Sequence, residues 1–208
     1  MSIQFVNKGG NGKYIVTDGI KFGGSIIFPT NIDTSNVVDM SSMFQSGDFS
    51  TIPQLDTSKV TNMQSMFSNC SQLTTIPQLD TSKVTNMQSM FIRCTQLTTI
   101  PQLNTSKVTN MQTMFSNCSQ LTTVPQLDAS SIVESMATNT YNKDIFLNCS
   151  SLSNESLNNI LAMCITMKRA YSTHRTLKRI GITSEQATTC QSLSNYQAFL
   201  NAGWTTGY

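Results

Sequence analysis

Apolar residues recur in fixed columns through the central half of the chain. The segment LDTSKVTNMQSMF occupies residues 55–67 and returns unchanged at residues 79–91, which sets a period of 24 residues. A unit of this length cannot bury its apolar side alone, so consecutive units must stack and share a continuous core. The pattern therefore predicts a solenoid, in which each repeat forms one coil.

The repeated apolar side chains are the predicted core. Methionine columns run beside phenylalanine and valine columns, and thioethers fill irregular gaps, so the sequence favours packing over metal binding for these methionines. This register requires Met66 and Met90 to be buried. One unit contributes Val60, Met63, Met66, Phe67, Cys70, Leu73, Ile76 and Leu79, and the columns continue in the neighbouring units.

Two kinds of local structure are predicted within each coil. The L-T-T-I segment before Pro77 or Pro101 is rich in β-branched residues and ends at a proline, which is typical of a short strand. The D-T-S-K-V-T-N-M-Q-S-M-F segment has an apolar spacing of three, three and one that suits a helical turn or a 3-10 segment. The expected fold is a parallel sheet on one face and short helical or 3-10 arcs on the other.

The order Phe67, Cys70, Leu73, Ile76 and Pro77 is repeated one unit later. This pattern resembles the BspA-like leucine-rich repeats, whose unit begins roughly F-x-x-C-x-x-L-x-x-I. The variant D-T-S-K-V-T-N-M-x-x-M-F is similar to repeats of bacterial and phage-encoded surface proteins. The resemblance covers about residues 31–152 and implies a leucine-rich-repeat solenoid with a role in surface recognition.

The two ends of the chain differ from the repeats. Residues 1–30 hold short β-prone runs between Gly-rich turn signals such as Asp18-Gly19, which predicts hairpins in a β-rich N-terminal cap. Residues 31–152 form about five coils of 23–24 residues, the last with an insertion. Residues 153–208 are predicted to form a helical C-terminal cap, with helices over residues 153–164, 183–190 and 195–202.

Composition narrows the expected partners. The net charge is +2 and charged residues are 12% of the chain, so bulk electrostatics predicts no nucleic-acid partner. No apolar run approaches the ~20 residues of a membrane span, so no membrane insertion is expected. The first residues lack the apolar core of a secretory signal. Together with abundant Ser, Thr, Asn and Gln, this favours a virion or extracellular surface protein that leaves its cell by lysis.

Reactive side chains are few. His174 is the only histidine, so the sequence builds no Ser-His-Asp or Cys-His set, and we expect no enzyme activity, no metal site and no cofactor. Four of the six cysteines fall in one repeat column, which favours free, buried thiols. Stacked coils would bring equivalent Cα atoms to about 4.8 Å, inside the disulfide range, so pairing stays an alternative.

Polar columns supply the candidate ligand face. Hydroxyls and amides that repeat at each coil suit a glycan or another repeating polymer, although any solvated sheet also shows such groups. The residues of this face are Thr75, Thr99, Thr123, Gln78 and Gln102. Asp and Lys columns also repeat, and we expect each Asp to cap the arc that follows it while the Lys compensates its charge. A charged array for a repeating ligand is the alternative.

A basic segment near the C-terminus is the second candidate surface. It either binds an anionic partner or is a solvated loop, and its basic residues are Lys168, Arg169, Arg175, Lys178 and Arg179. The sequence as a whole favours a non-enzymatic recognition or structural module on a phage virion, such as a tail, fibre or head decoration. Its partners would be other virion or surface proteins or a cell-surface polysaccharide, and homo-oligomers stay open. The alternative is a bacterial adhesin of the BspA-like type.

Overall fold

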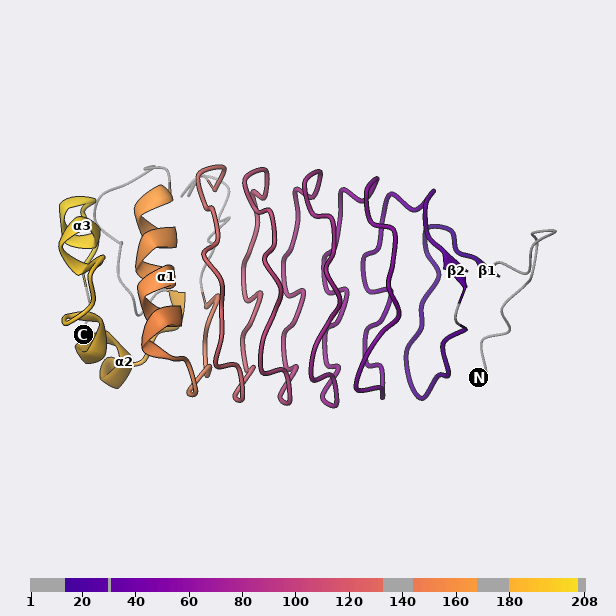
Figure 1. The fold of residues 1–208 in the computed structure, drawn as a ribbon, viewed down its shortest axis with the longest axis horizontal. Helices are drawn as coiled ribbons and strands as arrows, with labels where there is room; N and C mark the ends of the chain where they lie inside the picture. The colour runs from indigo at the N-terminus through magenta and orange to yellow at the C-terminus, as the bar shows by residue number, and fades with distance from the viewer. Residues whose placement is uncertain (1–13, 30, 133–143, 168–179, 206–208) are drawn as a thin grey trace.

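Consecutive repeats lie side by side as coils in a single row (Figure 1). The structure is a computed structural model that describes residues 14–29, 31–132, 144–167 and 180–205. The short strands β1 (Tyr14–Ile15) and β2 (Ile32–Asp33) lie at one end of the row. The helices α1 (Asn154–Thr166), α2 (Ser184–Cys190) and α3 (Tyr196–Asn201) lie at the other.

Backbone hydrogen bonds join each coil to the next one. In the arc that contains the methionines, the N–H groups of Met63, Ser65 and Phe67 donate to carbonyl oxygens of the following coil at 2.8 to 2.9 Å. In the opposite direction along the row, the N–H of Thr85 donates to the carbonyl of Thr61 in the preceding coil at 2.9 Å. Since such bonds leave the coil that makes them, one coil on its own would lack the partners for its backbone.

The apolar columns fill the interior of the coils. Met66 and Met90 are completely buried, which confirms the register predicted from the sequence. From Phe44 onward, each ring lies 5.4 to 5.5 Å from the next, centroid to centroid, with planes within 11° of parallel. Offset stacking at this distance adds to the burial of the rings. The stack runs through Phe22, Phe44, Phe67, Phe91, Phe115 and Phe146.

The predicted parallel sheet is wrong for the described coils. Their L-T-T-I segments form no strand, although Thr74, Thr98 and Thr122 each donate a backbone hydrogen bond to the preceding coil and one parallel bridge joins Thr99 to Thr123. The proline that follows each segment has no N–H to donate, so the ladder between coils stops after one or two residues. The two-stranded sheet of the described residues is β1 with β2, which pair in parallel.

The predicted helical or 3-10 arcs are also wrong over residues 31–132, where the arcs are chains of turns. Two residues of each arc have left-handed backbone, for example Ser65 with φ 56° and Asn69 with φ 61°. A helix would bond each N–H to a carbonyl four residues earlier, but here alternate N–H groups are committed to the next coil. The spacing of the apolar residues identified the buried side chains but not the path of the backbone.

The described part of the N-terminal segment pairs as a coil rather than as a hairpin. Tyr14 is aligned with Ile32 in the parallel pair, and Gly24 bridges Gly47 in the same sense. The Asp18-Gly19 turn forms, with φ +82° at Gly19, but its two arms do not pair with each other. At Asp18-Gly19 the hairpin prediction is wrong, because the backbone on either side of this turn bonds to the next coil, while the turns predicted before Lys13 lie outside the described residues.

The three C-terminal helices confirm the predicted ones. Ser153 caps α1 by accepting a hydrogen bond from the N–H of Ser156, and Thr183 and Gln186 form a capping box at α2. Side chains of α1 complete the hydrogen bonds of the last coil. Ser156 Oγ donates to the carbonyl of Thr122 and accepts from the N–H of Val124, both at 2.8 Å. Asn159 and Thr166 act similarly on the carbonyl of Val124 and the N–H of Ala129.

All six cysteines are free and buried, as the column predicted. Four of them donate a thiol hydrogen bond to the carbonyl of a phenylalanine in the preceding coil, for example from Cys70 to Phe44 at 2.9 Å. Burial raises the pKa of Cys70 from an ordinary value of 9.0 to about 11 and that of Cys149 to about 12. Burial also raises the pKa of Cys94 and Cys118 far above the ordinary value.

Alkaline pH should therefore destabilise the fold. An unfolded chain loses thiol protons near pH 9, while the folded chain keeps them, so stability is full below about pH 9 and falls as pH rises toward 11. Each thiol contributes up to about 1.4 kcal/mol per pH unit. In urea titrations at several pH values, Cys94→Ala should reduce the slope of unfolding free energy against pH by one thiol's share. Val84→Ala, which removes no thiol, is the control, and an equal slope in both variants would contradict the assignment.

The left-handed column offers a stabilising substitution. Asn69, Asn117 and Asn148 occupy it with φ of 60 to 64°, and Arg93 has φ 61° at the equivalent place. Asn tolerates this conformation better than Arg, so Arg93→Asn should raise the free energy of unfolding by roughly 1 kcal/mol. The measurement is the urea midpoint. Arg93→Ala loses the same charge without that tolerance, and if it matched Arg93→Asn, the explanation by backbone conformation would fail.

Candidate functional site

The acidic column begins a turn in every coil. Asp56 Oδ1 accepts hydrogen bonds from the N–H of Ser58 at 3.0 Å and from its hydroxyl at 2.7 Å. Asn104 makes the same pair of bonds with Ser106. The predicted role as a helix N-cap is wrong, since no helix follows in these coils, and the side chains form Asx turns instead.

The polar groups of Ser82 lower the pKa of Asp80. The hydroxyl of Ser82 has the largest effect, followed by the backbone N–H of Ser82, and the nearby charge of Lys83 acts in the same direction. The predicted compensation of Asp by Lys is therefore present, but it is the smaller effect. The lysine side chain is exposed at the surface of its coil.

In three coils, a buried threonine follows the Asp or Asn of this column and donates a hydrogen bond to the next coil. Thr57, Thr81 and Thr105 are 1 to 2% exposed. Their hydroxyls donate to the carbonyls of Asp80, Asn104 and Asp128 at 2.8 to 2.9 Å. This role was not predicted from the sequence, although a threonine directly after the acidic residue in three consecutive units was the available signal.

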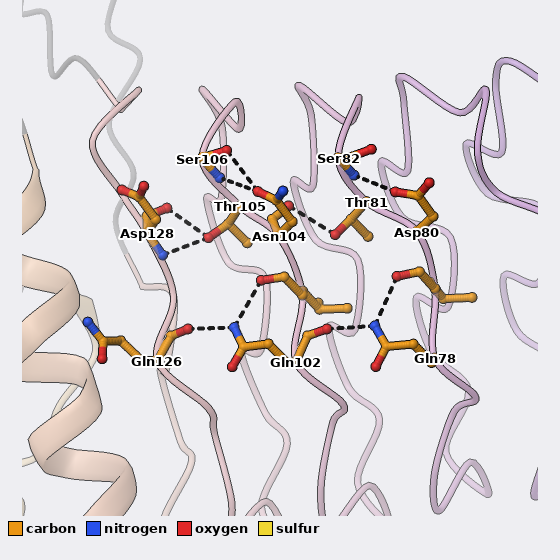
Figure 2. A pocket seen from close by; sticks show the side chains of 12 residues that line it. Gln78, Asp80, Thr81, Ser82, Gln102, Asn104, Thr105, Ser106, Gln126 and Asp128 are labelled. Atoms are coloured by element: carbon orange, nitrogen blue, oxygen red, sulfur yellow. Dashed lines mark hydrogen bonds between the residues drawn. The ribbon is translucent and has the colours of Figure 1, made fainter.

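The glutamine column forms a second connection between coils. Gln78 Nε2 donates to the carbonyl of Gln102 at 2.7 Å and to the carbonyl of Leu79 at 3.1 Å. Gln102 Nε2 repeats this with the carbonyls of Gln126 and Leu103 at 2.8 and 3.2 Å. The amides are thereby held at the same position in each coil (Figure 2).

A groove of about 620 Å³ runs over three coils between the glutamine column and the Asx turns. Figure 2 shows equivalent side chains repeated at each step of the row. We refer to this surface as the glutamine groove. It is lined by residues 78–82 and 102–106, together with Gln126 and Asp128.

The structure divides the predicted ligand face. Gln78 and Gln102 lie in the glutamine groove, whereas Thr75, Thr99 and Thr123 are exposed but do not line it. The neighbouring threonine column uses its hydroxyls within the fold, as Thr122 Oγ1 donates to the carbonyl of Thr98 at 3.1 Å. The function of the face stays a prediction.

The basic residues Lys168, Arg169, Arg175, Lys178 and Arg179 lie outside the described residues, as does His174 and the region of the insertion. Within the described ranges, no group of three or more His, Cys, Asp or Glu side chains is placed to hold a metal ion. Among the helices that the structure describes, none is both long and apolar enough to cross a bilayer.

Comparison with known proteins identifies one family. A family model described as "Mycoplasma protein of unknown function, DUF285" matches residues 17–126 and again residues 46–160. No curated protein matches the sequence. Among solved structures, the T. pallidum leucine-rich repeat protein (TpLRR) is similar with 17% identity and a TM-score of 0.39, over 72% of this chain and 87% of that one.

The glutamine bonds give a stability test of the site. Gln102→Met keeps the length of the side chain but removes both donors, so two carbonyls lose their partners and the free energy of unfolding should fall by about 1 kcal/mol. Urea denaturation measures this loss. Gln96→Met is the matched control, because Gln96 is exposed and lies outside the groove, and its change should stay within roughly 0.5 kcal/mol. Equal losses in the two variants would argue against a stabilising role of the glutamine hydrogen bonds between coils.

Proposed function

We propose that this chain, which belongs to the DUF285 family, is a non-enzymatic recognition or structural module of the leucine-rich-repeat type, built as a BspA-like solenoid and displayed on a surface. The carrier would be a phage virion, with the module as a tail, fibre or head decoration. A bacterial cell that uses the module as an adhesin is the alternative. The repeats are similar to surface proteins of both kinds.

One observation carries the proposal of ligand binding. The glutamine groove presents a glutamine and an Asp or Asn at each of three consecutive coils, and the amides of Gln78 and Gln102 are fixed by hydrogen bonds rather than free to rotate. A ligand with its own repeat would contact several coils at once and gain affinity through multiple linked contacts. Fixed side chains also lose little conformational entropy on binding.

We propose that the groove binds its ligand without catalysing a reaction. Many of the polar groups of the groove are engaged in holding a turn or joining two coils, and a carboxylate that accepts hydrogen bonds with a lowered pKa is a weak base. Such a surface is suited to holding a polymer, whether a glycan or an extended protein segment, in a fixed position along the row.

Blocking the groove tests its role. The double variant Ser82→Trp, Ser106→Trp fills the groove but keeps the backbone N–H groups that donate to Asp80 and Asn104. Its binding to an array of microbial polysaccharides should fall by about tenfold or more. The matched control is Gln72→Trp with Gln96→Trp, two exposed positions outside the groove. Comparable loss in both double variants would contradict a role for the groove.

The basic segment is the competing surface, and it needs its own variant. Charge reversal at Arg175, Lys178 and Arg179 should leave array binding unchanged if the groove is the binding site. If charge reversal abolished binding and the groove variant did not, recognition would belong to the basic segment instead.

A further inference from the structure

We infer that the glutamine groove selects neutral, hydroxyl-rich polymers and rejects polyanions, because its charged side chains are carboxylates and most of its side-chain hydrogen-bond donors are already used while its acceptors remain available. This inference rests on the proposed function and specifies its ligand class. The observations behind it are which side chains of the groove already donate or accept a hydrogen bond within the protein.

The glutamine amides face the ligand with oxygen. An amide NH₂ group has two donors, and in both Gln78 and Gln102 the nitrogen meets two backbone carbonyls. A flip of the amide would place oxygen against carbonyl oxygen at 2.7 or 2.8 Å, so the surrounding carbonyls fix the orientation. Each Oε1 is left with its lone pairs and accepts from no described residue, and Figure 2 shows these oxygens turned away from the bonded carbonyls.

Most of the hydroxyl groups of the groove are also used within the protein. Thr81 and Thr105 donate to carbonyls of the next coil, and Ser106 donates to Asn104 Oδ1 at 2.8 Å. The Ser82 backbone N–H donates to Asp80 Oδ1 at 2.9 Å. The side-chain donors that remain in the lining are the Ser82 hydroxyl and the amides of Asn104 and Gln126, while the glutamine oxygens and the Asp carboxylates offer a larger number of acceptor lone pairs.

Charge excludes two other classes of polymer. The lining contains the carboxylates of Asp80 and Asp128 and no lysine or arginine, so a polyanion would meet both repulsion and a shortage of donors. A polycation is disfavoured by the exposed lysines at Lys59, Lys83 and Lys107, one in each of three successive coils. A neutral chain that brings its own hydroxyl donors fits the remaining requirements.

The spacing of the coils suits such a chain. Parallel-paired backbones lie about 4.8 Å apart, and the stacked rings of successive coils are 5.4 to 5.5 Å apart. An extended sugar chain advances by a similar length with each residue, so it would place a hydroxyl near an equivalent Oε1 at every step. The inferred ligand is a neutral polysaccharide lying along the row.

Two pairs of polymers with matched backbones test the inference. Affinity electrophoresis at low ionic strength would compare hydroxyethyl cellulose with carboxymethyl cellulose, and dextran with dextran sulfate. The protein should bind the neutral member of at least one pair about tenfold more tightly than its anionic partner. Binding to poly-lysine in place of either neutral polymer would overturn the inference in favour of a cationic ligand.

A conservative variant separates the charge effect from folding. Asp80→Asn with Asp128→Asn copies the residue that occupies the central coil, where Asn104 makes the same turn. The variant should bind the anionic polymers several-fold more tightly than the wild type does, which narrows the difference between the two members of each pair. Equal binding of both members of a pair by the wild type would overturn the donor inference and leave groove recognition standing. If the wild type bound none of these four polymers, and the Ser82→Trp, Ser106→Trp variant still bound the polysaccharide array, both proposals would fail.

Discussion

Hydrogen bonds that leave one coil and end on the next are the interaction on which this structure depends. Met63, Ser65 and Phe67 each donate to the following coil, so every coil must present its carbonyls where its neighbour needs them. This requirement explains why equivalent residues share one backbone conformation, including the left-handed one at two places in each arc. It also explains why the rings of Phe91 and Phe115 are within 3° of parallel.

The same demand for partners shapes the exposed surface. The side chains of Gln78 and Thr81 donate hydrogen bonds to carbonyls of the next coil, and these bonds stabilise the row. The side of each amide that faces solvent is consequently its oxygen. Structural hydrogen bonds thus decide the polarity of the groove, and a surface built only for solubility would not need its amides held in one orientation.

The sequence predicted the contents of the core well because the repeat gives the same information several times over. A column such as Met66 and Met90 can be assigned to the interior without knowing the backbone path. The helices at the C-terminal end were also predictable, since Ser153 and Thr183 are strong local capping signals. The arcs were not predictable, because a three-residue apolar spacing fits both a helical turn and a row of turns with left-handed residues.

Only some of the residues that line the glutamine groove were predicted from the sequence. Gln78 and Gln102 were predicted as a polar column, but the burial of Thr81 and Thr105 was not, because a repeated threonine after the acidic position shows that the position matters without showing that it is buried. The orientation of the amides depends on carbonyls of another coil, which lie 24 residues away in the sequence. Only the stacked structure brings those groups together.

Helix α1 affects how the number of repeats in this protein can change during evolution. Ser156 and Asn159 supply the bonds that another coil would supply, so the row ends at a surface that does not need a further repeat. The terminus is therefore independent of the number of coils before it. A genetic duplication or loss of 24 residues between near-identical units would leave every junction intact. The reach of the groove can in this way be lengthened or shortened by recombination, with no new residue having to be selected.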